Sequence, residues 1–109
     1  MMEGLWTAEF GSSTGIFGGG VAVFRDGKIW GGDGTYYYVG EYKLNGNAFH
    51  ATLKIFPFID GAQSVFKTVG RDLTLELEGS LTDANRAIAQ GHPKGMSEMK
   101  FGAKLTRRV

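Results

Sequence analysis

Apolar and polar residues alternate along most of the chain, which is the pattern of half-buried β-strands. Over residues 4–10, for example, Trp6, Ala8 and Phe10 fall on one face and Leu5, Thr7 and Glu9 on the other. The alternation predicts about eight short antiparallel strands and no long amphipathic helix. The expected strands cover residues 4–10, 16–24, 29–30, 36–44, 49–55, 72–79, 86–91 and 97–106.

Turn-forming residues separate these segments. Asp26-Gly27 and Asn45-Gly46 each stand between apolar runs and predict two-residue hairpin turns, because a type I′ turn needs positive φ at both central residues. Three glycines, Gly18 to Gly20, interrupt the second strand and predict a bulge or sharp bend; no phosphate-loop spacing is met there. Further turns are expected at residues 31–34, 60–61, 82–85 and 92–95, and irregular structure leading into a strand over 57–70.

Eight strands with one apolar face each either close into a barrel or fold into a small sandwich. The 109 residues predict a single domain, 1–109. A net charge of +1 and the absence of cysteine give no sign of a nucleic-acid partner, a disulfide framework or a thiolate site. With no signal peptide pattern and no membrane-length apolar run, we expect a soluble cytoplasmic protein.

The inward faces define a possible apolar ligand cavity. Tyr38 and Tyr42 could orient a ligand there through their hydroxyl groups, although aromatic residues are also simply good strand formers. The outward residues Tyr37 and Val39 are candidates for a protein interface. The candidate cavity residues are Trp6, Phe10, Tyr38, Tyr42, Phe49, Leu53, Leu75 and Phe101.

A Gly-x-Trp motif at Gly4 to Trp6 is typical of lipocalin-like barrels, in which an Arg from the last strand lies across the Trp at the closed base. Arg107 continues the inward face of the last predicted strand. A cation–π contact between Trp6 and Arg107 would contribute about 1–2 kcal/mol when desolvated. The alternative is an ordinary core tryptophan and a solvated terminal arginine.

No constellation of catalytic residues is found. The two histidines, His50 and His92, have no metal-ligand spacing, and Glu76 and Glu78 read as a solvated strand face. No nucleophile is placed beside a base. We therefore expect no enzyme activity, cofactor or metal. The basic C-terminal strand lacks the interleaved aromatic residues of a nucleic-acid surface.

Several segments together resemble the GrlR-like family of small regulators, named for a negative regulator of type III secretion. The resemblance implies a lipocalin-like eight-stranded up-and-down barrel, a homodimer and a cytoplasmic role in binding a transcriptional regulator. The family's acidic Glu-Asp-Glu-Asp loop is absent, because residues 43–47 read Lys-Leu-Asn-Gly-Asn. The matching segments are 4–7, 19–23, 26–29, 31–33, 38–40 and 101–105.

Two functions follow as hypotheses. The first is a non-enzymatic regulatory or protein-interaction module whose partner is unknown. The alternative is a small barrel that carries or senses an apolar ligand, which requires an interior that the side chains leave open.

Overall fold

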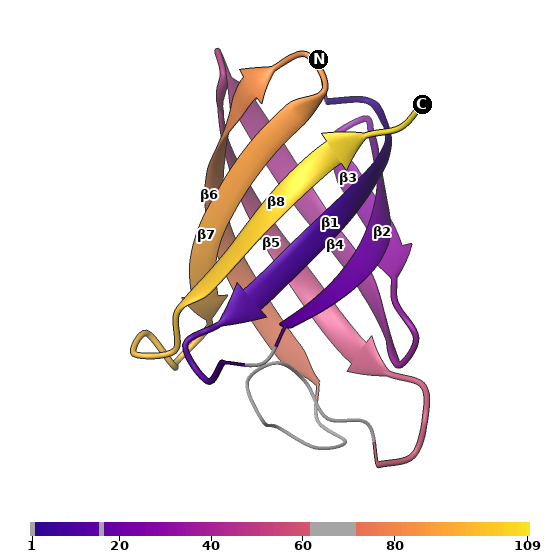
Figure 1. Cartoon of the computed structure of the whole chain (residues 1–109), viewed down its shortest axis with the longest axis vertical. Helices are drawn as coiled ribbons and strands as arrows, with labels where there is room; N and C mark the ends of the chain where they lie inside the picture. Colours follow the sequence, from indigo (N-terminus) through magenta and orange to yellow (C-terminus); the bar gives the residue numbers. More distant parts are fainter. Residues whose placement is uncertain (1, 16, 62–71) are drawn as a thin grey trace.

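The computed structural model describes residues 2–15, 17–61 and 72–109 and contains eight strands. Each strand pairs antiparallel with the next along the chain, and the last pairs with the first, so the sheet closes into a barrel (Figure 1). The prediction of an all-β, eight-stranded antiparallel barrel is confirmed, and the sandwich alternative is wrong. The strands are β1 (Gly4–Ser12), β2 (Phe17–Arg25), β3 (Lys28–Gly32), β4 (Tyr36–Asn45), β5 (Ala48–Pro57), β6 (Leu73–Asp83), β7 (Arg86–Pro93) and β8 (Phe101–Arg107).

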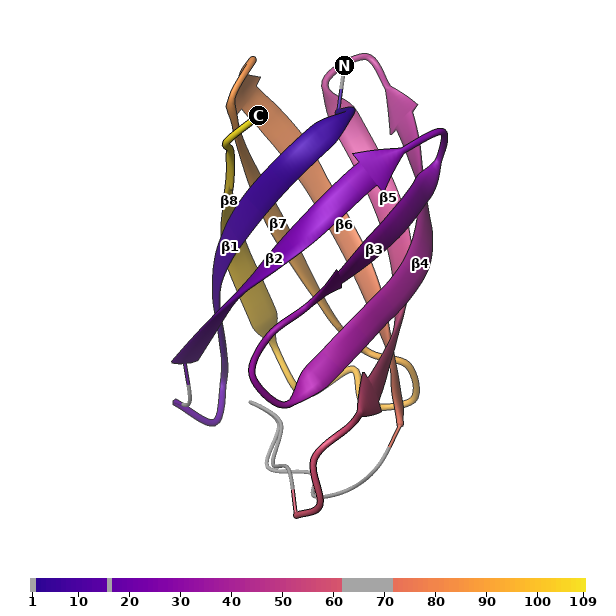
Figure 2. The same cartoon turned by 90° about the vertical axis from the view of Figure 1, so that its right-hand side faces the viewer.

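The barrel has two distinct ends. Both termini and the turns β2–β3, β4–β5 and β6–β7 lie at one end, which we call the base (Figures 1 and 2). The connections β1–β2, β3–β4 and β7–β8 lie at the other end, which we call the rim. Across residues 2–15, 17–61 and 72–109, no helix is long and apolar enough to cross a membrane.

The strand faces follow the predicted alternation. Trp6, Ile29, Tyr42, Phe49 and Leu75 are buried in the core, as the apolar parity of their strands requires. The intervening positions are more exposed, so that burial alternates residue by residue along β4 and over the first halves of β5 and β6. Burial of one face of every strand holds the closed sheet together.

The three consecutive glycines of β2 do not form a bulge. Gly18, Gly19 and Gly20 pair in regular register with Phe10, Glu9 and Ala8. The predicted bulge is therefore wrong; Gly18 and Gly20 instead leave room for the Phe10 ring and the Tyr38 hydroxyl. The register shift that the pairing does contain lies between Leu81 and Asp83 in β6.

Both predicted hairpin turns are present, but the second lies one residue later in the chain than predicted. Asp26 and Gly27 have φ values of 51° and 78°, the type I′ signature. The second hairpin is shifted by one residue, because Asn45 still pairs with Ala48. Its central residues are therefore Gly46 and Asn47, and Gly46 has a φ of 63°, which fits a type II′ turn with glycine first.

Other boundaries also differ from the prediction. Gly31 and Gly32 belong to β3, and residues 82–83 still belong to β6. His92 and Pro93 end β7. Pro93 pairs with Leu75 of β6 but lies beyond the last pair between β7 and β8, so on the β8 side its missing N–H leaves no strand partner without a hydrogen bond. Residues 97–100 form turns before β8. The turn at 60–61 is present, whereas residues 62–70 of the irregular segment expected over 57–70 lie outside the described part of the chain.

Candidate ligand-binding cavity

The barrel encloses a cavity of about 320 Å³ between the packed base and the rim. Aliphatic and aromatic side chains from all eight strands make up most of its wall, with Phe24 and Ile29 on the side nearer the base. Six of the predicted cavity residues line it. They are Phe10, Tyr38, Phe49, Leu53, Leu75 and Phe101.

Trp6 and Tyr42 do not line the cavity, and their assignment to it is wrong. Both are packed around Phe24 at the base, with ring centroids 6.0 Å from Phe24 to Trp6 and 5.1 Å from Phe24 to Tyr42. Strand parity correctly turns both side chains inward. Parity does not predict how far along the barrel axis a residue lies, and these two residues lie near the base, where side chains fill the interior.

The base is closed by the segment that precedes β1. Met2 and Trp6 are both 0% exposed, and the Trp6 indole Nε1 donates a hydrogen bond of 2.9 Å to the Met2 carbonyl oxygen. The guanidinium carbon of Arg107 lies 4.8 Å from the Trp6 ring centroid, so the expected cation–π contact is present. Arg107 also donates hydrogen bonds to the carbonyl oxygens of Glu3 and Ala84.

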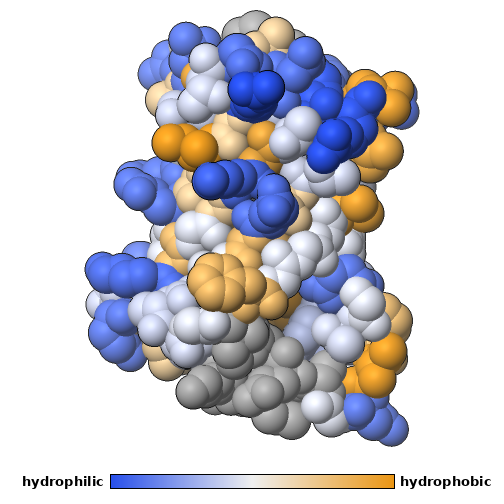
Figure 3. Space-filling model, viewed as in Figure 1, coloured by the Kyte–Doolittle hydropathy of each residue, from blue (hydrophilic) through white to orange (hydrophobic). Residues whose placement is uncertain are grey.

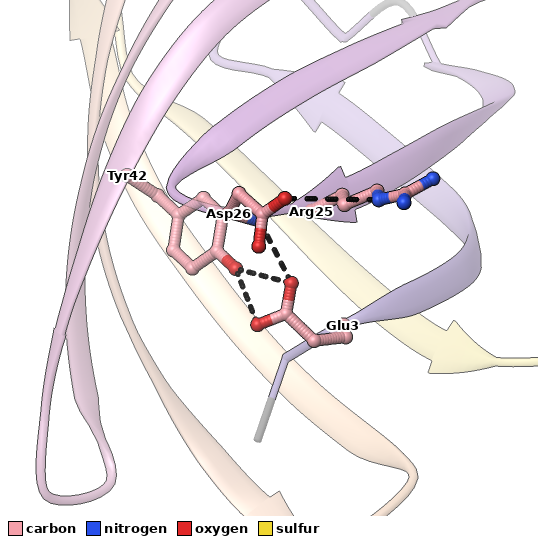
Figure 4. Close-up of polar contacts among 4 residues, drawn as sticks. All are labelled: Glu3, Arg25, Asp26 and Tyr42. Atoms are coloured by element: carbon pink, nitrogen blue, oxygen red, sulfur yellow. Dashed lines mark hydrogen bonds and ion pairs between the residues drawn. The ribbon is translucent and has the colours of Figure 1, made fainter.

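Glu3 fastens this segment to the β2–β3 turn (Figure 4). Its carboxylate accepts a 2.8 Å hydrogen bond from the Asp26 backbone N–H and longer contacts of 3.4 and 3.5 Å from the Tyr42 hydroxyl. Burial and then the negative charge of Glu3 raise the pKa of Tyr42. The exposed Arg25 adds a 3.7 Å ion pair to Asp26. The base is therefore a packed and tethered end.

The polar part of the cavity wall comes from one short stretch, the β3–β4 connection. Asp33 caps this turn, because its Oδ1 accepts hydrogen bonds of 2.8 Å from the backbone N–H groups of Thr35 and Tyr36. The Thr35 hydroxyl adds a longer bond of 3.3 Å to the same oxygen. This is the side-chain-to-backbone turn that aspartate favours.

The other carboxylate oxygen of Asp33 accepts a hydrogen bond from the Tyr38 hydroxyl. Burial, followed by this bond and the charge of Asp33, raises the pKa of Tyr38 well above its usual range. Tyr36 is also buried, and its hydroxyl has no hydrogen-bond partner among the residues that the structure describes. Burial and the charge of Asp33 raise the pKa of Tyr36 too. Both phenols are therefore neutral at physiological pH.

Gly20 leaves the space that the Tyr38 hydroxyl occupies. A Cβ atom at Gly20 would lie 2.9 Å from the Tyr38 hydroxyl oxygen and 2.9 Å from the Gly32 carbonyl oxygen. Both distances are shorter than ordinary contacts of a Cβ atom. Glycine in β2 thus permits the bond between Tyr38 and Asp33.

The outer wall carries a second feature, an apolar patch over β2, β3 and β4, the strands that face the viewer in Figure 2. Val23, Trp30 and Val39 are directly paired across these strands, and each is 38–47% exposed. Tyr37 lies beside them and stacks on Phe56 of β5, with ring centroids 5.1 Å apart. By contrast, hydrophilic side chains dominate the base half of the face in Figure 3.

The predicted interface residues Tyr37 and Val39 thus belong to a larger outer patch, which consists of Val21, Val23, Trp30, Tyr37, Val39 and Phe56.

His50 and Glu78 make a loose exposed pair at 3.9 Å on the outside of the barrel. Within the described ranges, no three histidine or acidic side chains are close enough together to hold a metal ion.

Sequence reasoning missed Asp33 and Tyr36 as cavity residues. A signal was present, since an aspartate that opens a turn three residues before a strand often hydrogen-bonds the following backbone. Neither the scan against protein-family models nor the search of curated proteins finds a match to this chain.

Proposed function

We propose that the protein binds a small, mainly apolar ligand inside the barrel. The observation that carries this proposal is the unfilled cavity of about 320 Å³ with its largely apolar wall. Ligand sites typically occupy roughly 300–1,000 Å³ and combine an apolar wall with a few polar groups. Here Asp33 and Tyr38 supply those groups from one side.

The apolar wall favours the same function. An apolar ligand that fills the cavity removes this surface from water, which is the main favourable term in binding apolar molecules. The closed barrel and the Trp6–Arg107 contact at its base support a lipocalin-like carrier or sensor.

Titration with the neutral apolar fluorophore N-phenyl-1-naphthylamine tests this proposal. Ala103 lines the cavity from β8, and its neighbour Lys104 points outward. Ala103→Phe puts a ring into the cavity and should weaken binding of the fluorophore at least about tenfold, because the ring takes the ligand's space. Lys104→Phe adds the same ring outside and should leave the affinity unchanged.

Circular dichroism melts establish that both variants remain folded. Absence of saturable binding to the wild-type protein would reject the proposal. Equal binding by the wild type and a folded Ala103→Phe protein would place the fluorophore elsewhere and also reject it.

We propose as a second role that the outer patch binds protein, with a second copy of the chain as the partner. The patch supports this role because Val23, Trp30 and Val39 form a continuous exposed apolar row, and large exposed apolar patches mark interaction sites. The resemblance to GrlR-like regulators supports the homodimer and a regulatory role. The missing acidic loop at 43–47 separates this chain from the namesake's activator-binding surface.

Sedimentation velocity at tens of micromolar tests the homodimer. Trp30→Lys should convert the dimer to monomer, because a charge in the centre of the patch is desolvated on association. Ile88→Lys is the matched control, since Ile88 is similarly exposed on β7, away from the patch. A wild-type protein that sediments as a monomer would eliminate this role.

A further inference from the structure

Among the described residues, the negative charge at the polar end of the cavity has no positive partner. The four hydrogen bonds that these residues give to the Asp33 carboxylate come from neutral donors, namely two backbone N–H groups and the hydroxyls of Thr35 and Tyr38. The described residues that line the cavity include no lysine, arginine or histidine. Each carboxylate oxygen has about two acceptor positions. From the described residues Oδ2 accepts one bond, that of the Tyr38 hydroxyl, so it can accept a further bond from a ligand.

The Tyr38 hydroxyl reinforces this bias toward acceptors. Tyr38 commits its hydroxyl proton to Asp33, so its oxygen can only accept a further hydrogen bond. Tyr36 also lines the cavity, but its hydroxyl oxygen is fully buried, so a ligand meets other atoms of this residue.

The charge also restricts which ligands fit. An anionic head group, such as the carboxylate of a fatty acid, would lie near Asp33 with no cation in the described wall to offset the repulsion. A neutral alcohol can donate one hydrogen bond but leaves the negative charge uncompensated. An ammonium group donates three hydrogen bonds and neutralises the charge.

We infer that the cavity selects an apolar amine, with its ammonium group against Asp33 and its hydrocarbon part against the apolar wall. This inference rests on the proposed ligand-binding function and adds the chemical class of the ligand. Asp33 is the specificity-determining residue, and Tyr38 holds its carboxylate in place.

Displacement of N-phenyl-1-naphthylamine by three eight-carbon ligands at pH 7 tests the inference. Octylamine is protonated at this pH, octan-1-ol is neutral and octanoate is anionic. The wild-type protein should bind octylamine about tenfold or more tighter than octan-1-ol, because a charge-assisted hydrogen bond is roughly twice as strong as a neutral one. Octanoate should bind most weakly.

Asp33→Asn separates charge from turn structure, because asparagine also caps such turns. This variant should lose most of the preference for octylamine over octan-1-ol, measured as the ratio of the two affinities within the same protein. Asp26→Asn makes the same charge change at the base, where Asp26 is outside the cavity, and should keep the wild-type preference.

The outcomes distinguish this inference from the function on which it rests. If the wild-type protein does not bind the fluorophore, both fail. If it binds the fluorophore but prefers octanoate, or binds octylamine and octan-1-ol equally, only the amine inference fails. An amine preference that survives in a folded Asp33→Asn protein would also overturn the role of Asp33.

Discussion

Single residues set the geometry of the polar end of the cavity. Gly20 of β2, Asp33 of the β3–β4 loop and Tyr38 of β4 meet at one point. The sequence predicts Tyr38 there, because strand parity turns it inward. It does not predict Asp33, because a turn residue has no strand parity and its partner becomes evident only once β4 is placed beside it.

Gly20→Ala is expected to destabilise the protein by about 1–3 kcal/mol, since overpacking forces side chains or backbone to shift. The new Cβ atom would contact the Gly32 carbonyl oxygen and the Tyr38 hydroxyl. Gly19→Ala is the control one residue away, where the nearest atom to a Cβ is 3.5 Å distant. Urea unfolding measures both. A loss of stability equal in the two variants would contradict the role given to Gly20.

Arg107 is the second residue whose contacts allow a sharp test. Arg107→Leu removes the cation–π contact with Trp6 and the hydrogen bonds to the Glu3 and Ala84 carbonyl oxygens. We expect a loss of about 1–3 kcal/mol in the free energy of unfolding.

The control for Arg107 is Arg25→Leu, which breaks only an exposed ion pair to Asp26 at 3.7 Å. Exposed pairs of this kind contribute about 0–1 kcal/mol. Chemical denaturation of both variants gives the comparison. If Arg107→Leu costs no more than Arg25→Leu, the contacts at the base do not stabilise the barrel.

At the scale of elements, the β2–β3 hairpin depends on left-handed backbone at its turn. Gly27 has a φ of 78°, and a side chain in that region costs about 1–2 kcal/mol. Gly27→Ala should lower the stability by that amount, as measured by thermal and urea unfolding.

Gly34→Ala provides the matched control for this turn. Gly34 also lies in a β-hairpin connection, but it has no positive φ, and a Cβ there would have no neighbour within 4 Å. Its stability should stay within about 0.5 kcal/mol of the wild type. A Gly34→Ala protein as unstable as Gly27→Ala would show that the effect is not conformational.

The pattern of alternation predicts where most strands lie but not where they all end. It finds β1, β4 and β5 because apolar parity runs through most of their length. It misplaces the junction of β7 and β8 for two reasons. Pro93 is buried at the end of a strand, which local rules disfavour, and Met99 contacts the core from a turn and thus imitates strand parity.

At the scale of the whole molecule, neither the closure of the sheet nor the volume of the cavity can be predicted from the local pattern of apolar and polar residues. The choice between barrel and sandwich depends on whether the first strand meets the last, as in the pairing of Trp6 with Arg107. The cavity depends on how far the inward side chains reach across the barrel. Small residues such as Ala8, Ala51 and Ala89 line it, and their parity is predictable, whereas the volume that they leave is not.

The pairing of β1 with β8 has a consequence for how the chain is made. During synthesis, β1 can pair with β2 as soon as both have left the ribosome. The other edge of β1 stays unpaired until β8 has been made, about a hundred residues later. Until then, β1 and β7 each present unpaired N–H and C=O groups, which are templates for association with other chains. We therefore expect truncation just before Phe101 to give an insoluble protein, even though seven of the eight strands remain.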